Sequence, residues 1–220
     1  EPVSAEEQTK AFGNILWDAY CFGKIEGTDH GVPDTYGQES TYFALYDVDG
    51  DGQEELLLNS TGASMADTVE YIWGYGDNGT HVELCEFPAL TCYDNGVIEA
   101  EWSHNQGLAG EFWPYFLYRY NAETDQYEIC GGADAWDKSV AKTKEQGDVF
   151  PDDIDADQDG VVYYLLPADW DGNYDRKPVD GEEYRTWRES FLEGASKLDD
   201  IWFWQLKEEN IAILGAEKPN

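Results

Sequence analysis

The chain has few basic residues: 13 Lys and Arg stand against 47 Asp and Glu, which gives a formal net charge of −34. Proteins that hold nucleic acid by neutralising its phosphates need an excess of basic groups, so the composition excludes that class of partner. The same charge repels an anionic membrane surface. Long apolar runs are also missing, since the longest covers the eight residues from Val161 to Ala168. A membrane-spanning helix needs about 20, so we expect no insertion of this segment into a membrane.

Signatures of catalysis are missing as well. The chain has neither the G-x-S-x-G elbow of serine hydrolases nor a phosphate-binding P-loop. Its three histidines, His30, His81 and His104, are scattered without the spacing of a metal-binding pair. Among so many carboxylates, a pair at any chosen spacing is uninformative, so acidic residues alone do not identify a glycoside hydrolase. The sequence therefore predicts no catalytic residues.

Two amphipathic helices are predicted near the ends of the chain. Ser4 with Glu7 forms a capping-box pattern, and apolar residues at helical spacing then predict a helix over 4–22. Asp180 with Glu183 is an Asp variant of the same pattern and predicts a second helix over about 181–197.

Short β-branched and aromatic runs, separated by Asn- and Gly-containing turns, fill the space between the helices. The expected strands are 41–46, 55–59, 69–75, 80–86, 97–102, 112–120, 126–130, 161–166 and 201–206. We predict an α+β fold: an antiparallel meander sheet of about seven to nine strands, with an N-terminal and a C-terminal helix packed on it. No break in composition divides the chain, so we expect residues 1–220 to form a single domain.

The four cysteines, Cys21, Cys85, Cys92 and Cys130, contain no C-x-x-C pair, which argues against a zinc ribbon or a thioredoxin-like redox site. They allow two disulfides in three pairings, and the sequence does not select one. Cys85 and Cys92 can face one another on a hairpin; the alternative is that all four thiols are reduced and buried.

An Asp-rich loop at residues 47–55, DVDGDGQEE, carries the clearest chemical signal. A tightly wound loop of this pattern gathers oxygen atoms around one hard cation, and calcium accepts six to eight of them. Strand-like segments flank the loop and position 12 is Leu58, so it is a β-loop-β connection rather than an EF-hand. We expect calcium here, with the side chains of Asp47, Asp49, Asp51 and Glu55 and the backbone carbonyl of Gln53 as ligands.

Residues 155–160, DADQDG, repeat the first half of this pattern. In a chain of this composition the pattern arises by chance roughly 0.03 times, yet it occurs twice. The second loop has Tyr163 and Leu166 where an acidic residue would complete the ligand set. It is the weaker calcium candidate, and the alternative for both loops is an acidic turn that holds only water. Its expected ligands are Asp155, Asp157, Asp159 and the carbonyl of Val161.

Residues 42–58, YFALYDVDGDGQEELLL, resemble the YxLYDIDGDGxxELIL segment of uncharacterised secreted proteins and lipoproteins of Gram-positive gut bacteria. They also resemble the FG-GAP-type loops of β-propeller repeats. The resemblance implies a calcium-binding β-loop-β unit and an extracellular or cell-surface location, with the signal or lipid-anchor segment absent from this chain. The chain has one clear loop of this type, so we do not expect a propeller.

The 9 tryptophans exceed what a core of this size usually needs. Exposed Trp side chains often stack on sugar rings or anchor protein partners, and the polar loop around Trp170 makes this residue the expected ligand contact. The alternative is that the aromatic rings pack in the core. We therefore expect a monomeric, exported, calcium-stabilised binding or accessory protein of the bacterial cell envelope with a glycan or protein ligand. A carbohydrate-active hydrolase or glycan-binding module is the alternative function.

Overall fold

The computed structural model describes residues 4–25, 27, 37–63, 67–102, 107–145, 147–172 and 177–219. The chain is organised as two compact units. Unit 1 consists of Glu1–Ala89, Asn121–Tyr127 and Leu198–Asn220, and unit 2 of Leu90–Tyr120 and Glu128–Lys197. The division into two compact units does not show whether each unit folds alone. The single domain expected for residues 1–220 therefore stays a prediction.

Helix α1 (Ala5–Phe22) opens unit 1 as the sequence predicted. The backbone N–H of Glu7 donates to Ser4 Oγ at 3.2 Å, and the Glu7 side chain accepts from the backbone N–H of Ser4. These reciprocal bonds satisfy two N–H groups that a helix start leaves without partners. The helix ends at Gly23, whose φ of 64° lies in the left-handed region that favours glycine.

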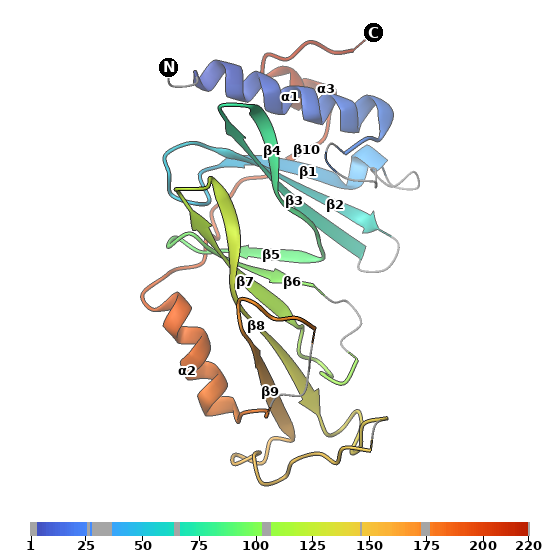
Figure 1. Ribbon diagram of the computed structural model, residues 1–220. Helices are drawn as coiled ribbons and strands as arrows, with labels where there is room; N and C mark the ends of the chain where they lie inside the picture. Colours follow the sequence, from blue (N-terminus) through green and yellow to red (C-terminus); the bar gives the residue numbers. More distant parts are fainter. Residues whose placement is uncertain are drawn as a thin grey trace. The chain divides into compact units, whose positions relative to one another are not determined.

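The sheet of unit 1 is antiparallel and has the order β10-β1-β2-β3-β4 (Figure 1). Its strands are β1 (Thr41–Tyr46), β2 (Glu55–Ala63), β3 (Asp67–Gly76), β4 (Gly79–Phe87) and β10 (Trp204–Gln205). Two short helices complete the unit, η1 (Gly37–Ser40) and α3 (Glu208–Ala212).

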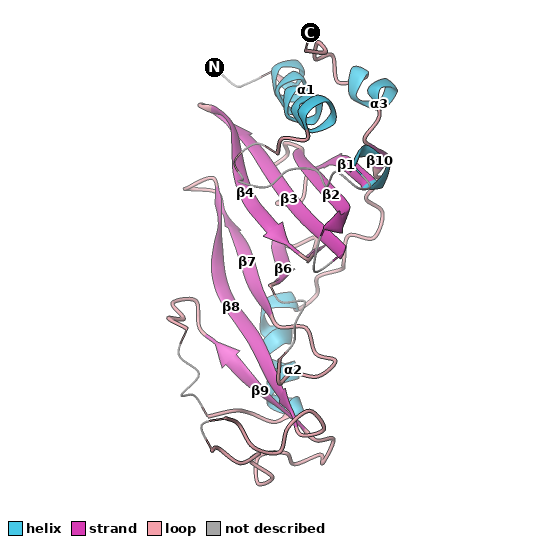
Figure 2. Ribbon diagram, turned by 90° about the vertical axis from the view of Figure 1, so that its right-hand side faces the viewer, coloured by secondary structure: helices cyan, strands magenta, loops and turns pink. Residues whose placement is uncertain are grey.

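One face of this sheet packs against α1. Leu58 pairs with Phe43 on one side and with Tyr71 on the other, and all three side chains belong to the buried cluster that includes α1. Figure 2 shows α1 and α3 at the same end of the sheet. The indole N–H of Trp17 in α1 donates to the carbonyl of Ala216 at 3.2 Å, so the first helix and the C-terminal residues share one core.

Unit 2 has a second antiparallel sheet, of order β5-β6-β7-β8-β9, on which helix α2 packs through Tyr184, Trp187 and Phe191. A Cβ atom at Gly131 would lie 2.9 Å from the Trp187 ring, so glycine allows the helix to approach closely. The elements are β5 (Ala89–Cys92), β6 (Val97–Glu101), β7 (Tyr115–Asn121), β8 (Gln126–Asp137), β9 (Val161–Leu166) and α2 (Gly181–Leu192).

The α+β class is confirmed, and within the described residues the strands divide between two five-stranded sheets instead of forming one meander. The chain passes from the first sheet to the second at Pro88, which lies between the end of β4 at Phe87 and the start of β5. Proline lacks the N–H that would extend a ladder. The hairpin considered for Cys85 and Cys92 therefore does not form, because β4 and β5 belong to different sheets.

Helix α2 is shorter than the expected 181–197, since it ends at Leu192 and Gly194 follows with a φ of 75°. Among the helices that the structure describes, none has the length and apolar character needed to cross a membrane.

Candidate metal centres

The first Asp-rich loop joins β1 to β2, and the pair Tyr46 and Glu55 closes it in the antiparallel register. One carboxylate oxygen each from Asp47, Asp49 and Glu55 lies within 4.8 Å of the others. The loop therefore gathers three of the four carboxylates that the sequence assigned to calcium.

Hydrogen bonds from the backbone hold this loop in shape. Asp47 Oδ2 accepts from the N–H of Gly52 at 3.1 Å, and Asp49 Oδ1 accepts from Asp51 at 2.9 Å. Asp51 Oδ1 accepts from the N–H of Gln53 at 2.7 Å, and Gln53 Nε2 donates to its other oxygen. Asp51 thus faces the Gln53 end of the loop and is outside the group of three.

Glu55 is the buried member of the group, with an exposed fraction of 3%. Its Oε2 accepts from the backbone N–H of Val48 at 2.8 Å. Burial, together with the Asp49 carboxylate, raises the pKa of Glu55 to about 9. Burial and the nearby carboxylates of Asp51 and Glu83 raise the pKa of Asp49 to about 7. Without a cation these groups repel one another; a bound cation removes the repulsion and favours their ionised forms.

The second loop has the same internal bonds. Asp155 Oδ2 accepts from the N–H of Gly160 at 3.1 Å, Asp157 Oδ1 from Asp159 at 3.2 Å, and Asp159 Oδ1 from Val161 at 2.8 Å. These bonds join the same loop positions, first to sixth, third to fifth and fifth to seventh, as in residues 47–53.

The backbone follows the same path in both loops. Positions four and six have positive φ in each: 80° at Gly50 and 94° at Gly52, 60° at Gln158 and 84° at Gly160. The second loop is therefore a structural repeat of the first, although one joins β1 to β2 and the other precedes β9.

Asp180 supplies the acidic group that the second loop lacks in sequence. Its carboxylate, with those of Asp155 and Asp157, forms a group of three within 4.8 Å. Asp180 Oδ1 accepts from the backbone N–H of Ala156, the second residue of its loop, at 2.9 Å. In the first loop, Glu55 accepts the equivalent bond from Val48, which is also the second residue. Sequence reasoning placed Asp180 at the start of α2 and missed this role, because the residue is distant from the loop in the chain.

Asp180 does precede α2, yet within the described chain its side chain makes no capping hydrogen bond to the helix. Asp155 is 7% exposed, and its Oδ1 is buried without a hydrogen-bond partner among the residues that the structure describes. A buried carboxylate oxygen left without a donor is unfavourable, whereas a bound cation satisfies it. Asp155 belongs to the group of three, so its unsatisfied oxygen makes the second loop a stronger metal candidate than its sequence suggested.

The aromatic residues differ from one another in exposure. Trp170 is half-buried in unit 2, where its ring centroid lies 6.4 Å from that of Trp102 and 5.8 Å from that of Phe116. In unit 1, Trp202 is 72% exposed and Trp204 is 39% exposed, next to strand β1. The sequence placed Trp202 and Trp204 in an expected strand and did not single them out as ligand contacts.

Comparisons with protein-family models, with curated proteins and with solved structures each find no match for this chain. The resemblance of residues 42–58 to secreted proteins and lipoproteins therefore stays an expectation from sequence. The case for metal binding depends on the geometry of the two loops.

Proposed function

We propose that the protein binds calcium at two sites, one in each unit, and that it is an exported, calcium-stabilised binding or accessory protein of the bacterial cell envelope. The observation that carries the proposal is the shared construction of the two loops. In each, carboxylates at the first and third positions converge with one closing acid, which bonds to the backbone N–H of the second position.

The donor atoms favour calcium. Both groups consist of carboxylate oxygens. The loop pattern adds the backbone carbonyls of Gln53 and Val161, at the seventh position, as the expected further oxygen donors. Magnesium prefers a stricter octahedral arrangement and retains several waters, so an irregular loop of this type suits calcium better.

Stabilisation is the direct consequence of such binding. A cation that binds only the folded state adds RT ln(1 + [Ca²⁺]/Kd) to the free energy of unfolding, about 2.7 kcal/mol at a hundredfold excess over Kd. A chain with a net charge of −34 also gains because each ion reduces self-repulsion. Weak sites of this class are saturated at extracellular calcium levels, which supports export together with the resemblance of residues 42–58.

A thermal melt in EDTA and in about 2 mM Ca²⁺ tests the proposal. Calcium is expected to raise the midpoint by several degrees, and Asp49→Asn is expected to remove the part of the rise due to the first loop. Asp153→Asn, an exposed carboxylate near the second loop, is the matched control for loss of charge. An unchanged midpoint of the unmodified protein in calcium would contradict the proposal.

A glycan or protein ligand is the second part of the proposed function, and the exposed Trp202 is the observation that supports it. A tryptophan face open to solvent stacks on sugar rings and anchors protein partners. Fluorescence titration with cell-wall oligosaccharides should give a weaker affinity for Trp202→Ala than for Trp170→Ala. Equal affinities would remove Trp202 from the ligand site. The hydrolase alternative depends on sequence alone.

A further inference from the structure

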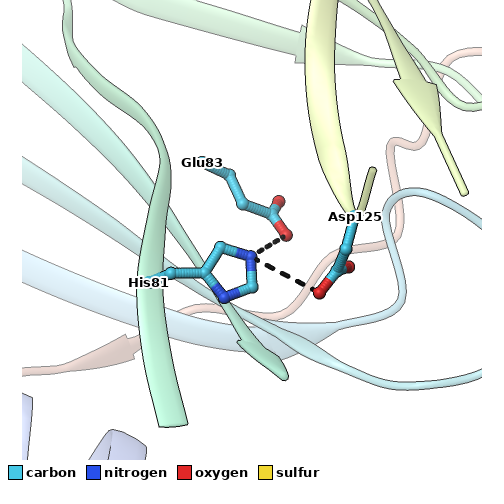
Figure 3. A group of neighbouring side chains, drawn as sticks. All are labelled: His81, Glu83 and Asp125. Atoms are coloured by element: carbon cyan, nitrogen blue, oxygen red, sulfur yellow. Dashed lines mark ion pairs between the residues drawn. The ribbon is translucent and has the colours of Figure 1, made fainter. Parts of the chain in front are cut away.

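Strand β4 brings His81 and Glu83 to one face of the sheet of unit 1. His81 pairs with Gly74 of β3, and Val82 pairs with Trp73. Leu84 then pairs with Ile72, so Glu83 is an extra residue at a β-bulge. Bulges redirect the side chain of the extra residue, and here the Glu83 carboxylate lies beside the His81 ring, as Figure 3 shows.

Asp125 comes to the same place from the turn between β7 and β8, a turn that belongs to unit 1. His81 Nε2 lies 3.6 Å from Glu83 Oε1 and 3.9 Å from Asp125 Oδ2 (Figure 3). One ligand atom from each of the three side chains lies within 4.8 Å of the other two. One nitrogen and two oxygen donors therefore converge from two places in the sequence, strand β4 and the turn before β8.

The inner atoms of this group lack hydrogen bonds. The Glu83 side chain is 2% exposed, and neither its Oε2 nor His81 Nε2 has a hydrogen-bond partner within the described ranges. The separation of 3.6 Å between His81 Nε2 and Glu83 Oε1 is too long for a good hydrogen bond. A carboxylate that is buried without donors is strongly unfavourable unless a positive charge binds it.

Glycine at two positions of β3 provides the space for the group. A Cβ atom at Gly74 would collide with Glu83 Oε1 and lie 2.9 Å from His81 Nε2. At Gly76 it would lie 2.9 Å from Asp125 Oδ2. A side chain at either position would therefore push the three donors apart.

We propose that His81, Glu83 and Asp125 bind a divalent first-row transition metal, with Zn²⁺ as the best fit. An imidazole nitrogen combined with two carboxylates suits zinc, whereas calcium selects oxygen donors alone. The site is thus distinct in chemistry from the two Asp-rich loops and goes beyond the proposed function. With three protein ligands, one coordination position is left for water or for a donor atom of a ligand.

The distances between the donor atoms show how far these atoms must move to bind zinc. Ligands at 2.0–2.1 Å from a tetrahedral zinc are about 3.3 Å apart, so Glu83 Oε1 must approach His81 Nε2 by about 0.3 Å and Asp125 Oδ2 must approach it by about 0.6 Å. Asp125 lies in a turn and its side chain is half-exposed, so this ligand has room to move. The competing explanation is an ion pair between a protonated His81 and Glu83 that binds no metal.

Cobalt and zinc titrations of the full chain test the proposal. The protein is stripped with EDTA, equilibrated with about 2 mM Ca²⁺ to fill the oxygen sites, and titrated with Co²⁺ and then with Zn²⁺. We expect one equivalent of Co²⁺ to give visible absorption and Zn²⁺ to displace it. His81→Asn and Glu83→Gln should each weaken Zn²⁺ binding by more than the 10- to 100-fold that loss of an outer partner causes.

Matched variants separate this site from general binding to carboxylates. Glu123→Gln removes an exposed charge from the same turn as Asp125 and should leave Zn²⁺ affinity unchanged. Far-UV circular dichroism of each metal-free variant reports that the fold is intact, and this readout depends on neither metal. Equal Zn²⁺ affinities in the unmodified protein, His81→Asn and Glu83→Gln would overturn the proposal, as would no Zn²⁺ binding, the outcome that the ion pair predicts.

Discussion

Asp180 accepts a 2.9 Å hydrogen bond from the backbone N–H of Ala156, 24 residues earlier in the chain. Glu55 makes the equivalent bond to Val48 within the first loop. A closing acid can thus come from inside a loop or from the start of a following helix. In unit 2 this hydrogen bond ties the residue that precedes α2 to the Asp-rich loop.

Asp180→Asn should reduce calcium binding from two equivalents to one. The asparagine oxygen can still accept from the Ala156 N–H, so the substitution removes the charge and preserves the hydrogen bond. Isothermal titration calorimetry measures the stoichiometry directly, with Asp153→Asn as the control. Two equivalents of unchanged affinity in Asp180→Asn would show that Asp180 is not a calcium ligand.

The metal-free protein should lose stability between about pH 5 and pH 9. The pKa values of Asp49 and Glu55, about 7 and about 9 in the fold, are near 3.9 and 4.3 in an unfolded chain. Between those values the folded state holds more protons, so the free energy of unfolding falls as the pH rises. The stability that the protonated forms of these two carboxyl groups contribute is fully present below about pH 4. It is lost as the pH passes through the two folded-state pKa values.

The measurement is the melting temperature in EDTA at pH values between about 5 and 9. Glu55→Gln is the matched variant. It cannot ionise, and its amide oxygen can still accept from Val48. The slope of its melting temperature with pH should be smaller than that of the unmodified protein. Saturating calcium should also flatten the slope, because both carboxylates are then ionised. Identical slopes for the two proteins in EDTA would contradict the assignment.

Arg188 should stabilise unit 2 through its contacts with β6. Its Nε and Nη2 donate to Glu99 Oε2 at 3.1 and 2.6 Å, and Nη2 also donates to the Tyr93 hydroxyl at 2.9 Å. Arg188→Met leaves the largely buried Glu99 carboxylate without its cation and should lower the free energy of unfolding by about 2 kcal/mol. Urea unfolding measures the loss. Adding Glu99→Gln to Arg188→Met should recover part of it, and strict additivity of the two single changes would argue against coupling.

Trp170→Ala should destabilise unit 2. The sequence made this loop residue the expected ligand contact, and in the structure its ring packs on Trp102 and Phe116. Removing a half-buried indole should reduce the free energy of unfolding by about 1–2 kcal/mol. Trp202→Ala, at a residue that is 72% exposed, should leave the urea midpoint nearly unchanged. The opposite ranking of the two midpoints would refute this assignment.

Features that depend on neighbouring residues could be predicted from the sequence. The capping box at Ser4 predicted the start of α1, and a continuous run of β-branched, aromatic and other apolar residues predicted β9 as Val161–Leu166. The Asp-rich loops were recognisable because the hydrogen bonds among their first seven positions span six residues or fewer. Short elements without periodicity, β5 and α3, were missed since their few residues carry too little pattern.

Features that depend on tertiary contacts could not be predicted in this way. Asp180 has the sequence context of a helix cap, and only the folded chain directs its side chain to Ala156. His81 showed no ligand spacing because Glu83 reaches it through a bulge and Asp125 comes from another hairpin. His30 and His104 lie outside the described residues. The division into two sheets likewise depends on which strands pair, which local propensity leaves open.

Unit 1 closes its core with residues on both sides of unit 2 in the sequence, and this has a consequence for synthesis. Leu206, Ile211 and Ala216 fill the same core as α1. On the ribosome, every strand of unit 2 emerges before these residues do. The part of the α1 core that these three residues cover therefore stays open while about 100 further residues are added at roughly 5–20 per second. During that interval, this exposed apolar surface is the part of unit 1 that is most open to aggregation.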